Sequence, residues 1–126
     1  MPMQPTGHVA IVDDDTSMRV ALARLFRLHG IDSRGYPSAR AFLTALPSAM
    51  PYCLVVDVNM PDMTGLDLQR ELLRLGIHIP TIVMTAVNNK RVAASAKSLG
   101  AAAVLSKPLT QDALMPAVNA AIKKLN

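Results

Sequence analysis

The sequence has 126 residues, which suits one domain with a hydrophobic core. Its composition, 51% apolar and 17% charged, excludes a disordered chain, and no apolar run is long enough for a membrane span or a secretion signal. The net charge of +4 comes from dispersed Lys and Arg residues, which favours a solvated surface, or an acidic protein partner, over direct nucleic-acid binding. The single cysteine, Cys53, excludes an internal disulfide and fits a reducing cytoplasm.

Short runs rich in β-branched residues recur along the chain, and helical patterns separate them. The run Cys53–Val56 is apolar throughout, which is typical of strands in a parallel sheet that is covered on both faces. The sequence therefore predicts five strands, at Val9–Val12, Ile31–Tyr36, Cys53–Val56, Ile82–Met84 and Ala103–Leu105.

Apolar residues at helical spacing predict a helix after each strand. Ser38 is a capping residue before the second helix, and Thr64 followed by Asp67 is typical of a capping box before the third. Glycine and proline favour helix ends. The five helices are expected to end near Gly30, Pro47, Gly76, Gly100 and Leu125.

The start of the fifth helix has two candidate caps, Thr110 and Asp112. With Thr110 as the cap, Pro116 would lie deep enough in the helix to remove a backbone hydrogen bond. With Asp112 as the cap, Pro116 lies in the first turn, where its missing N–H matters little. We therefore predict Asp112 as the cap, with a kinked helix as the alternative.

Polar residues stand at the carboxyl ends of the predicted strands, where open α/β sheets bind ligands. Asp13 and Asp14 follow the first strand, Asp57 follows the third, Thr85 the fourth and Lys107 the fifth. Two carboxylates about 4 Å apart repel by roughly 4 kcal/mol at an effective dielectric constant near 20. Lys107 and a hard divalent cation such as Mg²⁺ would compensate this charge.

Each of these residues alone has an ordinary structural explanation. Asp15 suits a helix start, Asp62 suits a turn, and Thr85 or Lys107 could be a strand or surface residue. Four strand ends that carry acid, acid, hydroxyl and ammonium groups in turn argue for a shared site.

Four motifs resemble the receiver domain of bacterial two-component response regulators. They are Val-Asp-Asp-Asp at 12–15, Asp-Val-Asn-Met-Pro-Asp-Met-Thr-Gly at 57–65, Met-Thr-Ala at 84–86 and Ser-Lys-Pro at 106–108. The resemblance covers about residues 8–125, so residues 1–126 are expected to form one receiver domain. It implies an α/β fold of five strands and five helices, with a doubly wound parallel sheet in the flavodoxin-like order 2-1-3-4-5.

The resemblance implies that Asp57 accepts a phosphoryl group from a histidine kinase or a histidine phosphotransfer protein. It implies Mg²⁺ as the cofactor, bound directly by Asp14, by Asp57 and by the backbone carbonyl of Asn59. By the same resemblance, Asp13 acts on the metal through a water molecule. Phosphoryl transfer asks mainly for positioning and for compensation of charge.

Three further residues take switch roles by the same resemblance. Lys107 compensates phosphoryl charge, Thr85 donates its hydroxyl to a phosphoryl oxygen, and the Ala86 amide is a second donor. The bond between Lys107 and Pro108 is expected to be cis. By the same resemblance, the output is a population shift that repacks the surface of the fourth helix, the fifth strand and the fifth helix.

The chain departs from the family pattern on that output surface. Val104 stands where the family usually has Tyr or Phe, and Leu109 where Phe is common. Valine has no ring to relocate, so we expect the switch to use helix shifts or an unusual partner. Pro116 alters the same surface.

Three other functions are alternatives to a switching receiver domain. An aspartate-nucleophile phosphatase would need an acid at position 59, which is Asn59, and a nucleotide-binding domain would need a glycine-rich loop that the sequence lacks. A receiver-like docking scaffold that does not switch stays open because of Val104. No helix-turn-helix is recognisable, so the expected partner is a downstream protein or a C-terminal output domain outside this sequence, and the expected location is the bacterial cytoplasm.

Overall fold

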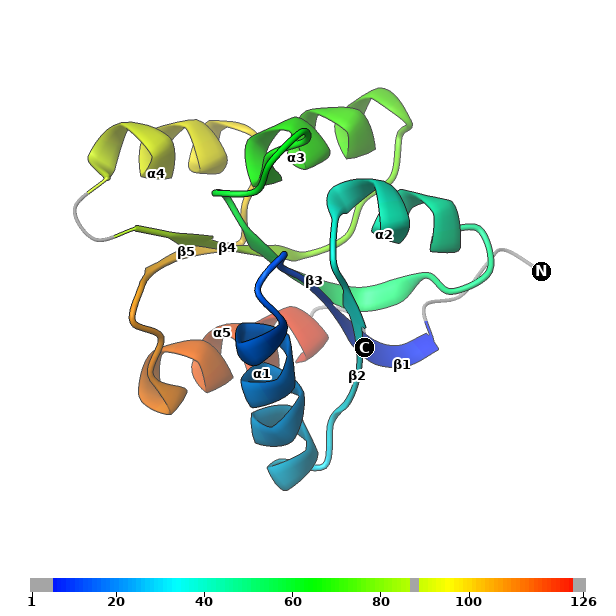
Figure 1. Cartoon of the computed structure of the whole chain (residues 1–126), viewed down its shortest axis with the longest axis vertical. Helices are drawn as coiled ribbons and strands as arrows, with labels where there is room; N and C mark the ends of the chain where they lie inside the picture. Colours follow the sequence, from blue (N-terminus) through cyan, green and yellow to red (C-terminus); the bar gives the residue numbers. More distant parts are fainter. Residues whose placement is uncertain (1–5, 87–88, 124–126) are drawn as a thin grey trace.

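Strands and helices alternate along the computed structural model, which describes residues 6–86 and 89–123. Within these ranges there are five strands and five helices, as the sequence predicts (Figure 1). In chain order they are β1 (Thr6–Val12), α1 (Thr16–Leu28), β2 (Asp32–Tyr36), α2 (Ala39–Ala45), β3 (Pro51–Asp57), α3 (Gly65–Arg74), β4 (Thr81–Thr85), α4 (Lys90–Ser98), β5 (Ala103–Ser106) and α5 (Gln111–Lys123).

The strands form one parallel sheet in the order β2-β1-β3-β4-β5, which confirms the predicted fold class. β1 and β3 are neighbours, and Val12 lies opposite Val56. The next residues along each strand are therefore Asp13 and Asp57, at the same edge of the sheet. Strand order alone thus brings the two acidic segments together.

The sheet separates two hydrophobic cores, because successive strand residues face opposite sides. Val9, Ile11, Cys53 and Val55 pack with α1 and α5, while the residues between them pack with α2, α3 and α4. Figure 1 shows this division, with α1 and α5 on one face and α2, α3 and α4 on the other. No helix among the described residues is long and apolar enough to span a membrane.

Cys53 is buried in the sheet, as the sequence predicts. Burial raises the pKa of its thiol to about 12. The thiol is therefore protonated and unreactive at neutral pH, since the thiolate is the reactive form.

Capping residues start the second and third helices as predicted. The Ser38 hydroxyl accepts from the Ala41 amide at 3.1 Å, and Thr64 and Asp67 form both bonds of a capping box. Asp15 caps α1 through the amides of Ser17 and Met18. The predicted glycine ends are confirmed, since the backbone is left-handed after α1, α3 and α4, at Gly30, Gly76 and Gly100.

The predicted cap of α5 is wrong, because the helix starts at Gln111 and not after Asp112. The Thr110 hydroxyl accepts from the Ala113 amide at 3.2 Å, and Pro116 lies inside the helix. The physical reason is burial: Leu114 and Met115 precede the proline, and both reach the core only if the helix has already begun. The predicted end at Leu125 lies outside the described residues.

Candidate phosphoryl-transfer site

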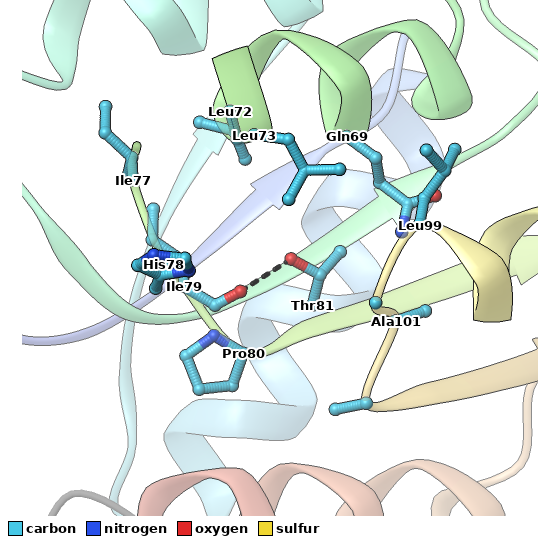
Figure 2. Close-up of a pocket in the computed structure, with 12 residues that line it drawn as sticks. Gln69, Leu72, Leu73, Ile77, His78, Ile79, Pro80, Thr81, Leu99 and Ala101 are labelled. Atoms are coloured by element: carbon cyan, nitrogen blue, oxygen red, sulfur yellow. Dashed lines mark hydrogen bonds between the residues drawn. The ribbon is translucent and has the colours of Figure 1, made fainter. Parts of the chain in front are cut away.

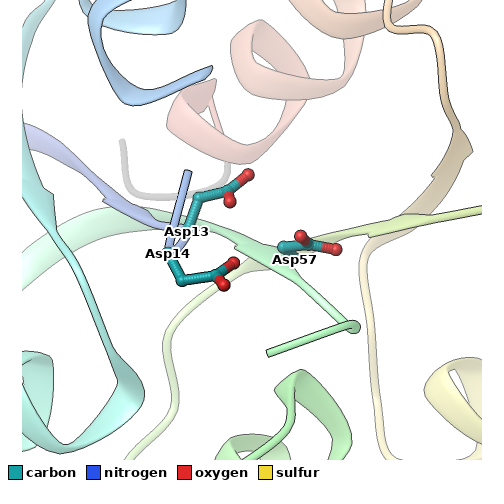
Figure 3. Close-up of side chains that lie close together, drawn as sticks. All are labelled: Asp13, Asp14 and Asp57. Carbon is teal, nitrogen blue, oxygen red and sulfur yellow. The ribbon is translucent and has the colours of Figure 1, made fainter. Parts of the chain in front are cut away.

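The acidic cluster lies at the carboxyl edge of the sheet, where β1 and β3 end. Figure 3 shows the side chains of Asp13, Asp14 and Asp57 close together. One oxygen of each carboxylate lies within 4.8 Å of the other two. Asp13 and Asp57 are 0% and 3% exposed, whereas Asp14 is exposed. The predicted convergence of these three acids is therefore present in the fold.

Lys107 reaches the same cluster from the loop after β5. Its ammonium Nζ donates to Asp57 Oδ2 at 2.9 Å, and the bond from Lys107 to Pro108 is cis, as expected. Asp57 Oδ1 accepts from the Asn59 amide at 3.0 Å, so both carboxylate oxygens have a donor. Burial lowers the pKa of Lys107, but the hydrogen bond and charge of Asp57 outweigh burial and raise it. Lys107 is therefore positively charged at neutral pH.

Asp13 is a buried carboxylate whose charge is incompletely balanced. Its Oδ1 accepts from the Asp15 amide at 2.9 Å, while Oδ2 is buried and has no hydrogen-bond partner among the described residues. Burial raises the pKa of the Asp13 carboxyl. The neighbouring charges of Asp57 and Asp14 raise it further, against the Asp15 amide and Lys107.

The cluster fits a hard divalent cation, by its chemistry and by its charge. Three carboxylates face a single ammonium group, and one buried oxygen still needs a positive partner. Mg²⁺ prefers oxygen ligands and usually binds one or two carboxylates together with water and phosphate. The exposed Asp14 leaves one side of the cluster open to such ligands.

Thr85 and Ala86 lie at the end of β4, next to the Lys107 backbone. The Thr85 side chain is buried, and its hydroxyl donates to the Ala86 carbonyl at 3.1 Å. The Thr85 carbonyl in turn accepts from the Lys107 amide at 2.8 Å. Ala86 is exposed and directly follows β4.

Val104 is set apart from this group, within β5. It lies opposite Val83 and packs, partly buried, against the core on the side of α2, α3 and α4. The structure thus brings the acids, Thr85 and Lys107 to one edge and leaves Val104 in the strand interior.

Three contacts near this edge were not predicted, two of them to the site itself and one, from Arg40, outside the acidic cluster. A Cβ added to Gly65 would lie 2.7 Å from the Asp57 carbonyl oxygen, so α3 packs directly on the end of β3. Arg19 donates to the Asp13 carbonyl, and Arg40 pairs with Asp62 at 2.7 Å across the loop after β3. Gly65 directly follows the capping residue Thr64, which is the one signal in the sequence for its contact. The arginine contacts have no such signal, because they depend on tertiary structure.

A separate groove of about 560 Å³ opens at the opposite edge of the sheet (Figure 2). It lies between the ends of α3 and α4 and the start of β4, where the Thr81 hydroxyl donates to the Ile79 carbonyl at 2.8 Å. None of the acidic cluster residues lines it. The groove is therefore distinct from the candidate site.

Known proteins with similar sequences match most of this chain. A sequence model of the family described as the response regulator receiver domain matches residues 9–119. The chain is 41% identical over 116 residues to nodulation protein W of Bradyrhizobium diazoefficiens, which covers 92% of this chain and 51% of that protein. It is 40% identical over 114 residues to the transcriptional regulatory protein FixJ of Azorhizobium caulinodans, covering 90% and 54%.

Solved structures show the same fold. The crystal structure of FixJ-N superposes with a TM-score of 0.87 at 36% identity, and the match covers 96% of each chain. Full-length FixJ from B. japonicum superposes with a TM-score of 0.88 at 32% identity, covering 98% of this chain and 61% of that one. The chain spans about half the length of the curated relatives it matches.

Proposed function

The chain belongs to the response regulator receiver family and is a phosphoacceptor signalling module, and on that premise we propose Asp57 as the acceptor. One observation carries this assignment. Asp57 is a buried carboxylate that sits between an ammonium group 2.9 Å away and two further carboxylates. No other acid at the described strand ends has a lysine partner and two acidic neighbours.

In the proposed reaction an Asp57 carboxylate oxygen attacks the phosphorus of a phosphohistidine. A P–O bond to Asp57 forms while the P–N bond breaks, and the electron pair of that bond stays on the imidazole. We propose that Asp14, Asp57 and the Asn59 carbonyl hold Mg²⁺, with Asp13 acting through a water molecule. When bound, this ion compensates charge on the phosphoryl oxygens.

Lys107, Thr85 and the Ala86 amide complete the proposed site. The Lys107 ammonium group already donates a hydrogen bond to the Asp57 carboxylate. After phosphorylation it would donate to a negatively charged phosphoryl oxygen instead. The Thr85 hydroxyl would turn from the Ala86 carbonyl toward that oxygen. This exchange of partners is the local event that would start the switch.

The proposed donor is a histidine kinase or a histidine phosphotransfer protein. The proposed receiver of the signal is a downstream protein or an output domain, since the matched relatives are about twice as long as this chain. A domain that accepts one phosphoryl group and passes on a conformational signal is not a turnover enzyme, so we expect no catalytic hydrolysis of small phosphoesters.

The test is intact-mass analysis after incubation with acetyl phosphate. We expect a gain of one phosphoryl group with Mg²⁺, no gain with excess chelator, and no gain in Asp57→Asn. Asp62→Asn is the matched control, because Asp62 is 67% exposed on the loop after β3 and pairs with Arg40 outside the cluster. An unchanged mass in the native protein, or a full gain in Asp57→Asn, would refute the assignment.

A further inference from the structure

Arg19 connects the first turn of α1 to the acidic end of β1. Its Nη1 donates to the Asp13 carbonyl oxygen at 2.7 Å, and its Nη2 donates to the Thr16 hydroxyl at 3.1 Å. The side chain is half-buried. A short bond from a charged donor is stronger than a bond between neutral groups, so Arg19 holds this carbonyl firmly.

The Asp13 carbonyl belongs to the peptide group that begins Asp14. Because the peptide group is planar, fixing this oxygen also fixes the plane that contains the amide nitrogen and Cα of Asp14. Asp14 is exposed and has no core packing to orient it. Apart from Arg19, this segment is held by the Asp13 amide, which donates to the Tyr36 carbonyl at 3.2 Å, and by the Asp13 carboxylate bond to Asp15.

A glycine in β2 provides the space for this side chain. A Cβ added to Gly35 would lie 3.3 Å from Cδ of Arg19 and 3.7 Å from its Cβ. The arginine stem therefore crosses the edge strand at the one residue without a side chain. A larger residue at position 35 would push the stem away from the Asp13 carbonyl.

We propose that Arg19 is a positioning residue for cation binding, which sets the geometry of Asp14 through the Asp13 carbonyl and depends on the space left by Gly35. The inference rests on the proposed function, because it assumes that the acidic cluster binds Mg²⁺. Arg19 contacts the backbone of the cluster and none of the three carboxylates through a described hydrogen bond.

The direction in which Mg²⁺ affinity changes when Arg19 is removed distinguishes a positioning role from an effect of its charge alone. Arg19 is a cation bound to the backbone of the acidic segment, so its removal by electrostatics alone would leave the binding of another cation unchanged or strengthen it. Loss of positioning would weaken binding. Removal of a group that orients a metal ligand without touching the metal typically lowers metal affinity by roughly 10–100-fold.

The experiment is a Mg²⁺ titration of the whole chain, followed by amide NMR shifts of residues 13–15 and 57–59. In Arg19→Gln we expect the dissociation constant to rise by roughly tenfold, and in Arg19→Lys we expect partial rescue. Gly35→Val changes no charge and should also weaken binding. Arg24→Gln is the matched control, because Arg24 is exposed on the same helix and its removal changes the net charge equally.

Three outcomes decide the question. The proposal is supported if Mg²⁺ binding is weaker in Arg19→Gln and Gly35→Val and unchanged in Arg24→Gln. The amide NMR spectra of all three variants must also be well dispersed, which shows that the variants are folded. Equal or tighter binding in Arg19→Gln, while the native protein binds Mg²⁺, overturns the positioning role alone. Absence of any Mg²⁺-dependent shift at the cluster of the native protein overturns the proposed metal site itself.

Discussion

Single residues at the carboxyl edge show how the site is built at the expense of fold stability. Asp13 is fully buried, one of its oxygens has no partner within the described residues, and two further carboxylates lie beside it. Such a group destabilises the native state, since a buried polar atom without a partner costs about 1–3 kcal/mol. A fold that keeps this residue gains a place for a cation.

Replacement of Asp13 by Asn should therefore stabilise the metal-free protein at pH 7, by about 1–3 kcal/mol. Burial raises the Asp13 pKa in the folded state above its ordinary value of 3.8, so the folded protein keeps the proton to a higher pH than the unfolded chain does. Ionisation of Asp13 thus lowers stability as pH rises through this interval. Urea unfolding with excess chelator should show a gain at pH 7 that shrinks as the pH falls toward 3.8.

The same variant should bind Mg²⁺ more weakly, because it lacks one negative charge of the cluster. This account of the Asp13 carboxyl would be contradicted if the Asp13→Asn protein were less stable than the native protein at pH 7. It would also be contradicted if the gain in unfolding free energy grew as the pH falls.

At the scale of elements, the close packing of α3 against the end of β3 holds the strand of the proposed acceptor in place. Gly65 begins α3, and its amide donates to the Val58 carbonyl at 3.2 Å. The backbone of Gly65 contacts the backbone of Asp57 and Val58 directly, with no flexible side chain between them that could move aside. The first turn of α3 therefore prevents Val58, the residue after Asp57, from moving toward the helix.

Replacement of Gly65 by Ala should destabilise the fold and disturb the acceptor. The new Cβ would lie 2.7 Å from the Asp57 carbonyl oxygen and 3.0 Å from Cα of Val58. Overpacking of this kind costs about 1–3 kcal/mol. The midpoint of urea unfolding measures the loss, and the rate of mass gain with acetyl phosphate measures the effect on Asp57.

Gly7→Ala is the control for this substitution, because a Cβ at Gly7 would meet nothing within 4 Å. We expect its stability to change by less than about 0.5 kcal/mol. A Gly65→Ala protein as stable and as reactive as this control would show that the contact does not constrain Asp57.

Elements also show which features are readable in a sequence. The buried strands were predictable because they are short apolar runs, and the edge cluster followed because parallel strands share one carboxyl edge. The start of α5 was not predictable from local rules, since burial of Leu114 and Met115 outweighs the backbone bond lost at Pro116. The contact from Arg19 was equally out of reach, because its acceptor is a backbone carbonyl that any residue provides.

At the scale of the whole molecule, a signal must travel from the edge cluster to a surface that a partner reads. Val104 packs from β5 against the core under α2, α3 and α4, and its side chain has one stiff torsion. Among the described helices α4 is thinly anchored, with Ala96 as its one buried residue. We therefore expect α4 to respond to phosphorylation more than the interior of β5.

Amide NMR of the protein before and after phosphorylation with acetyl phosphate and Mg²⁺ measures this response. The largest shifts away from the site should fall in α4, with small shifts at Val104 and Val83 in the paired strands. Asp57→Asn under the same conditions separates phosphorylation from metal binding. Shifts that are larger at Val104 than in α4 would refute a helix-based switch.

The measurement that tests the central claim most directly is chemical mapping of the phosphorylated residue. Borohydride reduces an aspartyl phosphate to homoserine, so the acceptor is recorded as a changed residue in the peptide sequence. After phosphorylation with acetyl phosphate and Mg²⁺, we predict homoserine at position 57 and unchanged Asp13, Asp14 and Asp62. Homoserine at any of those three positions, or at none, would contradict the assignment of Asp57 as the phosphoacceptor.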